Sequence, residues 1–260
     1  MDYVTHFHRE VQSFEAAARR VAGEEAPDVP SCAGWTMSDL VLHLAGVHRV
    51  VTAVIEERRS GPVNPAELVA QLPSDTAGWP NPETAPSRGP LPPGLVDWFA
   101  EGAAVLEGVF ATTDPALEVW TWSAERTAGF WSRMQVIEAA VHRWDAENAL
   151  GEPQDMDADL AADAIRQTFE VMVPARRAFK PARPTAGETY RFVRTDGDGE
   201  WAVRFADEQV RLGDFPADVT VSGTASELML FLWERIPADR LTVSGDTQVL
   251  DRYFELAPPI

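Results

Sequence analysis

Apolar residues recur at steps of three and four along the first two thirds of the chain, a pattern typical of amphipathic helices. Thr36 followed by Asp39 forms a capping-box pattern, so one helix should begin near Met37. Pro174 interrupts the last helical segment, because proline lacks the backbone N–H that a helix interior needs. Helices are expected over residues 2–24, 37–59, 95–110, 131–150 and 155–179.

The period changes to two beyond a Pro-rich stretch at about residue 183, which predicts strands separated by turn clusters such as residues 196–199. The predicted fold class is α+β, with an up-down helical bundle over residues 1–182 and a small α+β domain over residues 183–260. The expected strands are 190–195, 201–205, 209–212, 219–221 and 241–244, with helices over 226–235 and 247–256.

Residues 62–93 contain nine prolines, so regular structure should be sparse there, apart from a short helix near residues 65–72. A loop of this length in a compact domain is usually functional or mobile. It can form a wall or lid over a pocket, with Trp79 as the residue of interest, or it can be a variable surface excursion.

Composition excludes several classes of protein. The chain of 260 residues carries 41 acidic against 22 basic residues, a formal net charge of −19, and no basic run, which disfavours nucleic acid and anionic membranes as partners. No apolar run approaches the roughly 20 residues of a membrane span, and no signal-peptide core is visible, so we expect a cytoplasmic protein. Cys32 is the single cysteine, which rules out an internal disulfide framework.

Residues 131–147 carry the main candidate chemistry, because Glu138 and His142 lie one helical turn apart at the edge of an apolar face, with Asp145 beside them. Burying a carboxylate and an imidazole without partners costs several kcal/mol as an order of magnitude. A divalent cation would compensate. A salt bridge from Arg133 or Arg143 to Glu138, with His142 as a hydrogen-bonded core histidine, is the other interpretation.

A second histidine on a predicted helix strengthens the metal interpretation. His43 and His48 flank an apolar stripe but are roughly 140° apart at ~100° per residue, so they cannot both serve one site. His43 is nearer the centre of the stripe. If the helices pack side by side, His43, Glu138 and His142 give two imidazoles and one carboxylate with an open fourth position, the form of a catalytic zinc site.

Two stretches resemble the mycothiol-dependent maleylpyruvate isomerase family, part of the DinB-like superfamily of metal-binding helical bundles. They are VPSCAGWTMSDLVLHLAGVHR and MQVIEAAVHRWDAENALG. The tail, residues 218–254, is similar to the family's C-terminal domain, which resembles sterol carrier protein folds. The resemblance places the family's metal ligands on His43, Glu138 and His142. It also places an aspartate on Asp145, with a pocket-lining role or a role orienting an imidazole N–H; a surface salt bridge is the alternative.

The resemblance implies a zinc ion, or another divalent metal, and mycothiol, the low-molecular-weight thiol of actinobacteria, as cosubstrate. The thiolate would either isomerise a conjugated double bond or remain attached to a small-molecule substrate, and the sequence does not separate isomerase from S-transferase. A maleyl-type diacid would need cationic groups, for which Arg88, Arg126, Arg133 and Arg143 are candidates. The alternatives are a non-catalytic, metal-stabilised bundle whose tail binds an apolar ligand or partner, and a metal hydrolase that needs no thiol. Oligomeric state stays open.

Overall fold

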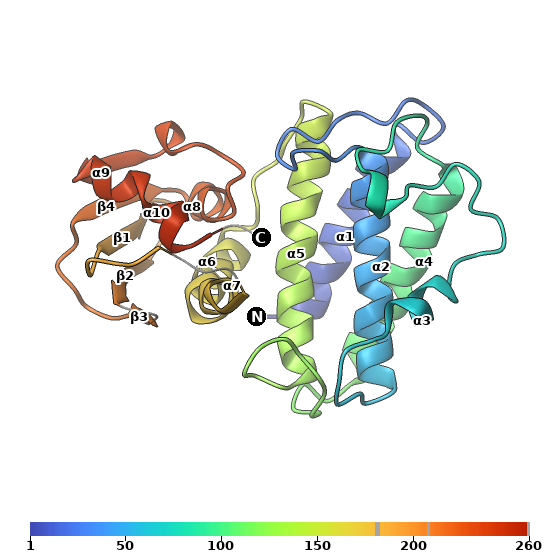
Figure 1. Ribbon diagram of the computed structural model, residues 1–260, viewed down its shortest axis with the longest axis horizontal. Coiled ribbons are helices and arrows are strands. Elements are labelled where there is room, and N and C mark those ends of the chain that lie inside the picture. The colour runs from blue at the N-terminus through green and yellow to red at the C-terminus, as the bar shows by residue number, and fades with distance from the viewer. Residues whose placement is uncertain (180–182, 207–208, 259–260) are drawn as a thin grey trace. The chain divides into compact units, whose positions relative to one another are not determined.

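The computed structural model describes residues 1–179, 183–206 and 209–258, which form two compact units, Met1–Gln154 and Asp155–Ile260. The first unit is helical and the second combines helices with a sheet (Figure 1). The predicted α+β class is therefore confirmed.

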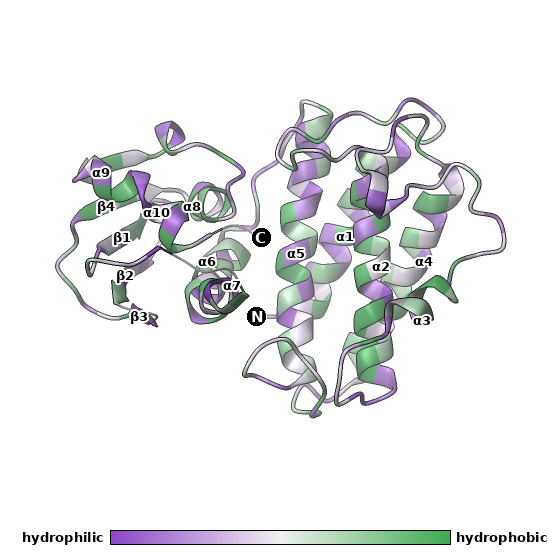
Figure 2. Cartoon of the chain, viewed as in Figure 1, coloured by the Kyte–Doolittle hydropathy of each residue, from purple (hydrophilic) through white to green (hydrophobic). Residues whose placement is uncertain are grey.

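Four long helices build the first unit: α1 (Tyr3–Arg19), α2 (Met37–Glu56), α4 (Pro93–Thr112) and α5 (Ala128–Ala149). Helix α1 packs against α4 and α5, and α2 packs against the same two helices. Hydrophobic residues recur along each of the four helices, as the periodicity predicts (Figure 2). The short helices α3 (Pro65–Val69) and η1 (Pro82–Thr84) interrupt the segment between α2 and α4.

Helix α2 begins where its capping box predicts. The backbone N–H and the hydroxyl of Thr36 both donate to Asp39, at 2.8 and 2.9 Å, and this fixes the entry of the chain into the helix. Leu40 and Leu44 are fully buried one turn apart and direct one face of α2 into the bundle core. This capped, anchored start holds the next turn, which carries His43, in a defined position.

By length and composition, α2 is also apolar enough to cross a membrane, whereas the sequence pattern suggested no such stretch. Of its most apolar 18-residue window, 61% is buried inside the unit, and core helices of soluble proteins pass the same test. The burial supports a core role for this helix.

The second unit is built on a five-stranded sheet of order β3-β2-β1-β4-β5, in which β1 and β4 are parallel and the other pairs are antiparallel. Tyr190 and Phe192 of β1 are fully buried in its core, where Tyr253 packs against both rings. The strands are β1 (Thr189–Arg194), β2 (Glu200–Ala206), β3 (Gln209–Leu212), β4 (Val219–Gly223) and β5 (Thr242–Gly245). The helices are α6 (Ala158–Gln167), η2 (Thr168–Met172), α7 (Val173–Phe179), α8 (Ala225–Leu232), η3 (Ala238–Arg240), α9 (Thr247–Asp251) and α10 (Tyr253–Leu256).

The division between the units differs from the expected boundary at residues 182 and 183, of which residue 182 lies outside the described part of the chain. The segment 155–179 belongs to the second unit, because α6 packs against α8 and buries Leu160 and Ile165 there. Helical periodicity showed that this segment has an apolar face, but not which unit the face packs against.

The helical periodicity of residues 95–110 places Val105 on the apolar face, toward the bundle core, but the structure does not. Val105 of α4 is 52% exposed, and its neighbour Leu106 is fully buried in its place. Adjacent residues on a helix are about 100° apart, so an error in the predicted direction of the core decides which of two adjacent apolar residues is expected to be buried.

Candidate functional site

Three of the residues singled out from the sequence meet between α2 and α5. Ligand atoms of His43, Glu138 and His142 all lie within 4.8 Å of one another, although His43 is about a hundred residues away in the chain. Nε2 of His43 is 3.1 Å from Oε1 of Glu138, and the two imidazole rings lie with centroids 5.2 Å apart. The packing of α2 on α5 thus produces the cluster that the helical angles indicated.

Glu138 is held from two sides. His43 contacts one carboxylate oxygen, and the Gln135 side-chain amide donates to the other at 2.7 Å. Burial alone raises the pKa of Glu138, but the hydrogen bond with His43 and the nearby imidazoles outweigh burial and lower the pKa. Glu138 is therefore a carboxylate. Of the two arginines considered as its salt-bridge partners, Arg143 forms ion pairs with Glu10 and Glu147.

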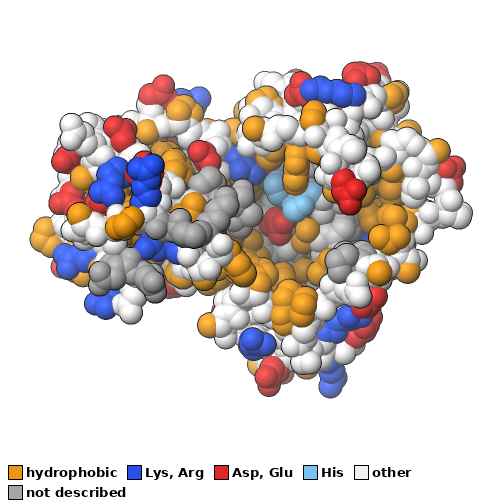
Figure 3. All heavy atoms as spheres, viewed as in Figure 1, with side chains coloured by type: hydrophobic (Ala, Val, Ile, Leu, Met, Phe, Trp, Pro, Cys, Tyr) orange, Lys and Arg blue, Asp and Glu red, His pale blue; other side chains and the backbone are white. Residues whose placement is uncertain are grey.

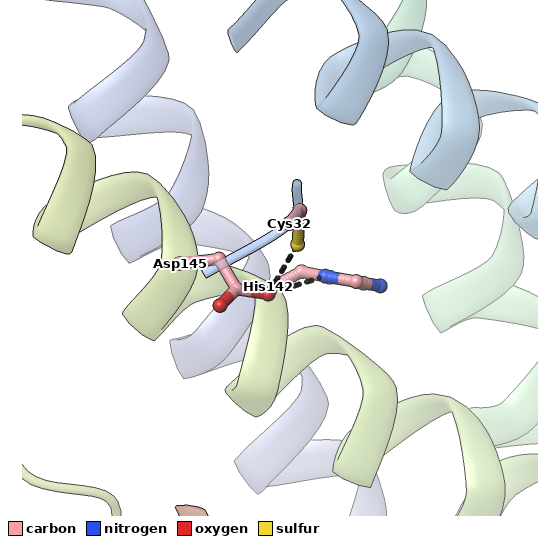
Figure 4. A group of neighbouring side chains, drawn as sticks. All are labelled: Cys32, His142 and Asp145. Atoms are coloured by element: carbon pink, nitrogen blue, oxygen red, sulfur yellow. Dashed lines mark hydrogen bonds and ion pairs between the residues drawn. The ribbon is translucent and has the colours of Figure 1, made fainter. Parts of the chain in front are cut away.

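His142 is fixed by Asp145. Nδ1 of His142 lies 2.9 Å from Oδ2 of Asp145, and the Asp145 side chain is completely buried (Figure 4). Burial lowers the pKa of His142, although the hydrogen bond with Asp145 opposes this, so the imidazole is neutral at neutral pH. A carboxylate accepts only from N–H, which assigns the proton to Nδ1 and leaves the lone pair on Nε2.

Asp145 in turn is anchored by the loop before α2. The hydroxyl of Ser31 donates to Oδ1 at 2.6 Å, and the thiol of Cys32 donates to Oδ2 at 3.3 Å (Figure 4). Cys32, His142 and Asp145 form a second group with ligand atoms within 4.8 Å. Both oxygens of Asp145 already accept hydrogen bonds from the protein, however, so this group supports His142 and is the poorer metal site.

From the sequence, Asp145 had an orienting role only as one of several alternatives, and Ser31 and Cys32 had no assigned role. The signal that marks them is the stretch VPSCAGWT itself, which precedes the capping box. Asp145 contacts Nδ1 of His142 and is absent from the lining of the cavity beside His43, so of the two roles considered for it the geometry favours orientation.

His48 lies outside the cluster, as its helical angle predicted. Its side chain is completely buried, with ring centroids 5.3 Å from Phe7 and 5.4 Å from Phe99. Neither ring nitrogen has a hydrogen-bond partner among the described residues. Burial lowers the pKa of His48 from 6.5 to about 3, which makes it a neutral core residue.

A cavity of about 530 Å³ opens beside His43. A histidine and an acidic side chain are visible in a hollow of the helical unit that hydrophobic side chains border (Figure 3). Of the two interpretations of residues 62–93, a pocket wall and a surface excursion, the structure supports the wall, because Trp79 and its neighbours line the cavity. The lining residues are Trp35, Asp39, Leu42, His43, Gly46, Val47, Val50, Val69, Leu72, Thr76, Trp79, Pro80, Pro82, Ala85 and Trp98.

The four arginines considered as anchors for a diacid are absent from the described lining of this cavity. Arg88 forms an ion pair with Asp28 at 2.5 Å on the surface, and Arg143 is engaged with acidic partners as described above. Arg126 is exposed and Arg133 is partly buried. None of them is placed to hold a carboxylate in this cavity.

Comparison with known proteins gives concordant matches in both units. Residues 5–147 match the family described as the mycothiol maleylpyruvate isomerase N-terminal domain, and residues 159–252 match the MDMPI C-terminal domain. The uncharacterized proteins MT0763 and Rv0738 from two strains of Mycobacterium tuberculosis are each 23% identical over 189 residues, covering 72% of this chain and 88% of theirs. Crystal structures of the mycothiol-dependent maleylpyruvate isomerase and of a single-site mutant of it share the fold, with a TM-score of 0.60, 18% identity and coverage of 94% of this chain and 93% of theirs.

Proposed function

The chain belongs to the mycothiol maleylpyruvate isomerase family, and from that membership and the site we propose that it is a cytoplasmic, metal-dependent enzyme that uses mycothiol as a thiol cosubstrate. The observation that carries the proposal is the cluster of His43, Glu138 and His142. Two of the three side chains are largely buried, and the Glu138 carboxylate lies 3.1 Å from the imidazole of His43.

The donor set fits a divalent cation of the zinc type. Two imidazoles and one carboxylate are the ligands that borderline metals prefer, and three protein ligands leave a position for a substrate atom. His43, Glu138 and His142 would hold the ion. Zinc bound there would lower the pKa of a coordinated thiol from ~8.5, so that thiolate is present at neutral pH.

The surrounding residues of the chain hold these three in place. Gln135 fixes the carboxylate of Glu138, and Asp145 fixes the tautomer and the ring orientation of His142. Trp35 packs on the His43 ring, with centroids 5.1 Å apart. Such support matters because a ligand set acts well only when its geometry is set before the substrate binds.

The chemistry then depends on the carbon that the thiol meets. The sulfur bonds to an electrophilic carbon of the substrate, and the thiol proton passes to solvent. Where that carbon ends a double bond conjugated to a carbonyl group, the π electron pair moves onto the carbonyl oxygen as an enolate. After rotation about the new single bond, the enolate electrons re-form the double bond in the trans form as the sulfur leaves with its bonding pair, which is isomerisation. Where a leaving group departs with the bonding electron pair, the sulfur stays, which is S-transfer.

Metal content tests the site. The purified protein should contain about one zinc, or another divalent ion, per chain. His142→Ala should lose the metal, whereas His48→Phe, which replaces a buried ring outside the cluster, should keep it. Equal metal content in both variants, or a fully active metal-free protein, would contradict the assignment.

Turnover with mycothiol tests the reaction. Consumption of the thiol in step with an electrophile indicates S-transfer, and thiol-dependent turnover without consumption indicates isomerisation. His142→Ala is the matched control and should be inactive in either assay. Turnover that is indifferent to the thiol would refute thiol dependence and favour metal-assisted hydrolysis.

A further inference from the structure

The indole rings of Trp35, Trp79 and Trp98 line the cavity beside His43. Trp35 packs on His43, and Trp79 from the Pro-rich segment packs on Trp98 of α4, with centroids 5.3 Å apart. Aromatic walls of this kind bury large apolar area and favour stacked or edge-on rings of a ligand. A volume of about 530 Å³ lies within the range of roughly 300–1,000 Å³ that is usual for small-molecule sites.

Gly46 supports the view that this space is kept open. It lies on α2 one turn beyond His43 and lines the cavity, and a Cβ atom built on it meets no atom within 4 Å. A glycine inside a helix costs about 0.5–1 kcal/mol relative to alanine, so it normally answers a packing need. No neighbouring protein atom would clash with a side chain at Gly46, so the space beside this glycine is part of the cavity.

Gly102 of α4 shows the contrast. A Cβ atom on Gly102 would lie 2.3 Å from the Arg49 guanidinium, so a larger residue there would displace the Arg49 side chain. Arg49 stacks 3.6 Å above Trp98 and donates to the carbonyl oxygens of Ala45 and Trp98. Its charge is thus used to hold Trp98, and Arg49 is not among the residues that line the cavity.

The charge of the lining is negative. Burial raises the pKa of Asp39, but hydrogen bonds from Thr36 and Ser87 outweigh it and lower the pKa, so Asp39 is a carboxylate at neutral pH. The described lining contains no lysine and no arginine. In the metal-stripped protein, a carboxylate placed in this cavity would meet the like charge of Asp39, with no lysine or arginine in the described lining to compensate it.

We infer that this cavity receives the neutral aromatic body of an electrophilic substrate and presents its reactive carbon beside His43, in place of a small dicarboxylate. The inference rests on the proposed thiol function for its catalytic meaning, but the binding itself does not depend on metal or thiol. His43 belongs both to the cavity lining and to the proposed ligand cluster, which places the two functions next to each other.

Calorimetric titration of the full-length protein, metal-loaded and metal-stripped and without thiol, tests the binding. The probes are naphthalene-2-methanol, naphthalene-2-carboxylate, naphthalene-2-methylammonium and maleate. In the metal-stripped protein, the neutral arene should bind at least about tenfold more tightly than either charged arene. The carboxylate meets the like charge of Asp39, and the ammonium loses its hydration to face a carboxylate that already accepts hydrogen bonds from Thr36 and Ser87. Maleate should bind more weakly still. Preference for maleate or for the ammonium probe would overturn the inference.

Gly46→Leu is the diagnostic variant. The leucine side chain should fill the cavity and weaken binding of the neutral arene by at least about tenfold, while the metal content stays that of wild type. Gly108→Leu is the matched control, since Gly108 is an exposed helix glycine of α4 whose added Cβ atom also meets nothing within 4 Å. It should leave arene binding unchanged.

A second variant covers the case in which Gly46→Leu fails to fold. Trp79 lies in the segment between α2 and α4, outside the four long helices, so Trp79→Ala should weaken arene binding with the bundle intact. Unchanged arene affinity in a folded Gly46→Leu or Trp79→Ala protein would refute the assignment. If the arene binds but no thiol-dependent turnover is found, the cavity assignment is supported and the proposed enzyme function is refuted. Failure of the cavity assignment can therefore be distinguished from failure of the proposed function.

Discussion

Replacing His48 by phenylalanine should make the helical unit more resistant to acid. His48 is completely buried against Phe7 and Phe99, and neither of its ring nitrogens has a partner among the described residues. Its pKa falls from 6.5 to about 3 on folding, chiefly because burial disfavours the imidazolium. The carboxylate of Glu138 opposes this shift, and the nearby cations and histidines reinforce it.

The sign and size of the effect follow from proton linkage. Because the pKa is lower in the folded protein, the unfolded chain binds more protons below pH 6.5. Above pH 6.5 the neutral His48 therefore takes nothing from the free energy of unfolding. As the pH falls from 6.5 toward 3, the unfolded chain takes up the proton and the free energy of unfolding decreases. At pH 5 the loss is about 2 kcal/mol, and its limit is about 5 kcal/mol, from 1.36 kcal/mol per pKa unit. Phenylalanine has a similar shape and no proton to bind.

Urea denaturation of metal-stripped protein at pH 7 and pH 5, followed by circular dichroism, measures the difference. Between these two pH values the wild type should lose about 2 kcal/mol more of its free energy of unfolding than His48→Phe. His8→Phe serves as control, because the His8 side chain is 57% exposed and should behave as wild type. Equal pH dependence in wild type and His48→Phe would show that His48 is hydrogen-bonded or charged in the folded protein, and the reasoning would fail.

Further predictions concern the support of the cluster and its core. Asp145→Asn should weaken metal binding by roughly 10–100-fold, measured by competition with a chromophoric chelator, because the amide no longer fixes the His142 tautomer. Gln135→Leu removes the donor to Glu138 and should also lower metal affinity in that competition, whereas an affinity equal to wild type would show that Gln135 does not position the carboxylate. Leu44→Ala, at a fully buried position of α2, should cost about 2–5 kcal/mol of unfolding free energy in urea titrations.

The proposed ligands were predictable from the sequence because each lies on a long helix. A rotation of ~100° per residue separates His43 from His48 and joins Glu138 to His142, and the family resemblance selected the same residues. The hydrogen bonds from Ser31 and Cys32 to Asp145 were not predictable, since they join a loop to a helix more than a hundred positions away. The placement of α6 failed for a related reason, because an apolar face does not specify its partner.

The cavity follows the same physical division. Part of its lining comes from α2, where His43 and Gly46 are one turn apart. Another part comes from residues 69–85, where the prolines interrupt any helical or strand periodicity, so the sequence does not predict their positions. The position of Trp79 depends on its contact with Trp98, which in turn is held by Arg49. Helix geometry sets the positions of the proposed metal ligands, whereas long-range packing of residues 69–85 shapes one wall of the cavity. The proposed metal site and the proposed substrate site therefore depend on different segments of the helical unit. If the inferred substrate site is correct, we therefore expect substitutions at residues 69–85 to change which electrophile fits without altering the distances among His43, Glu138 and His142.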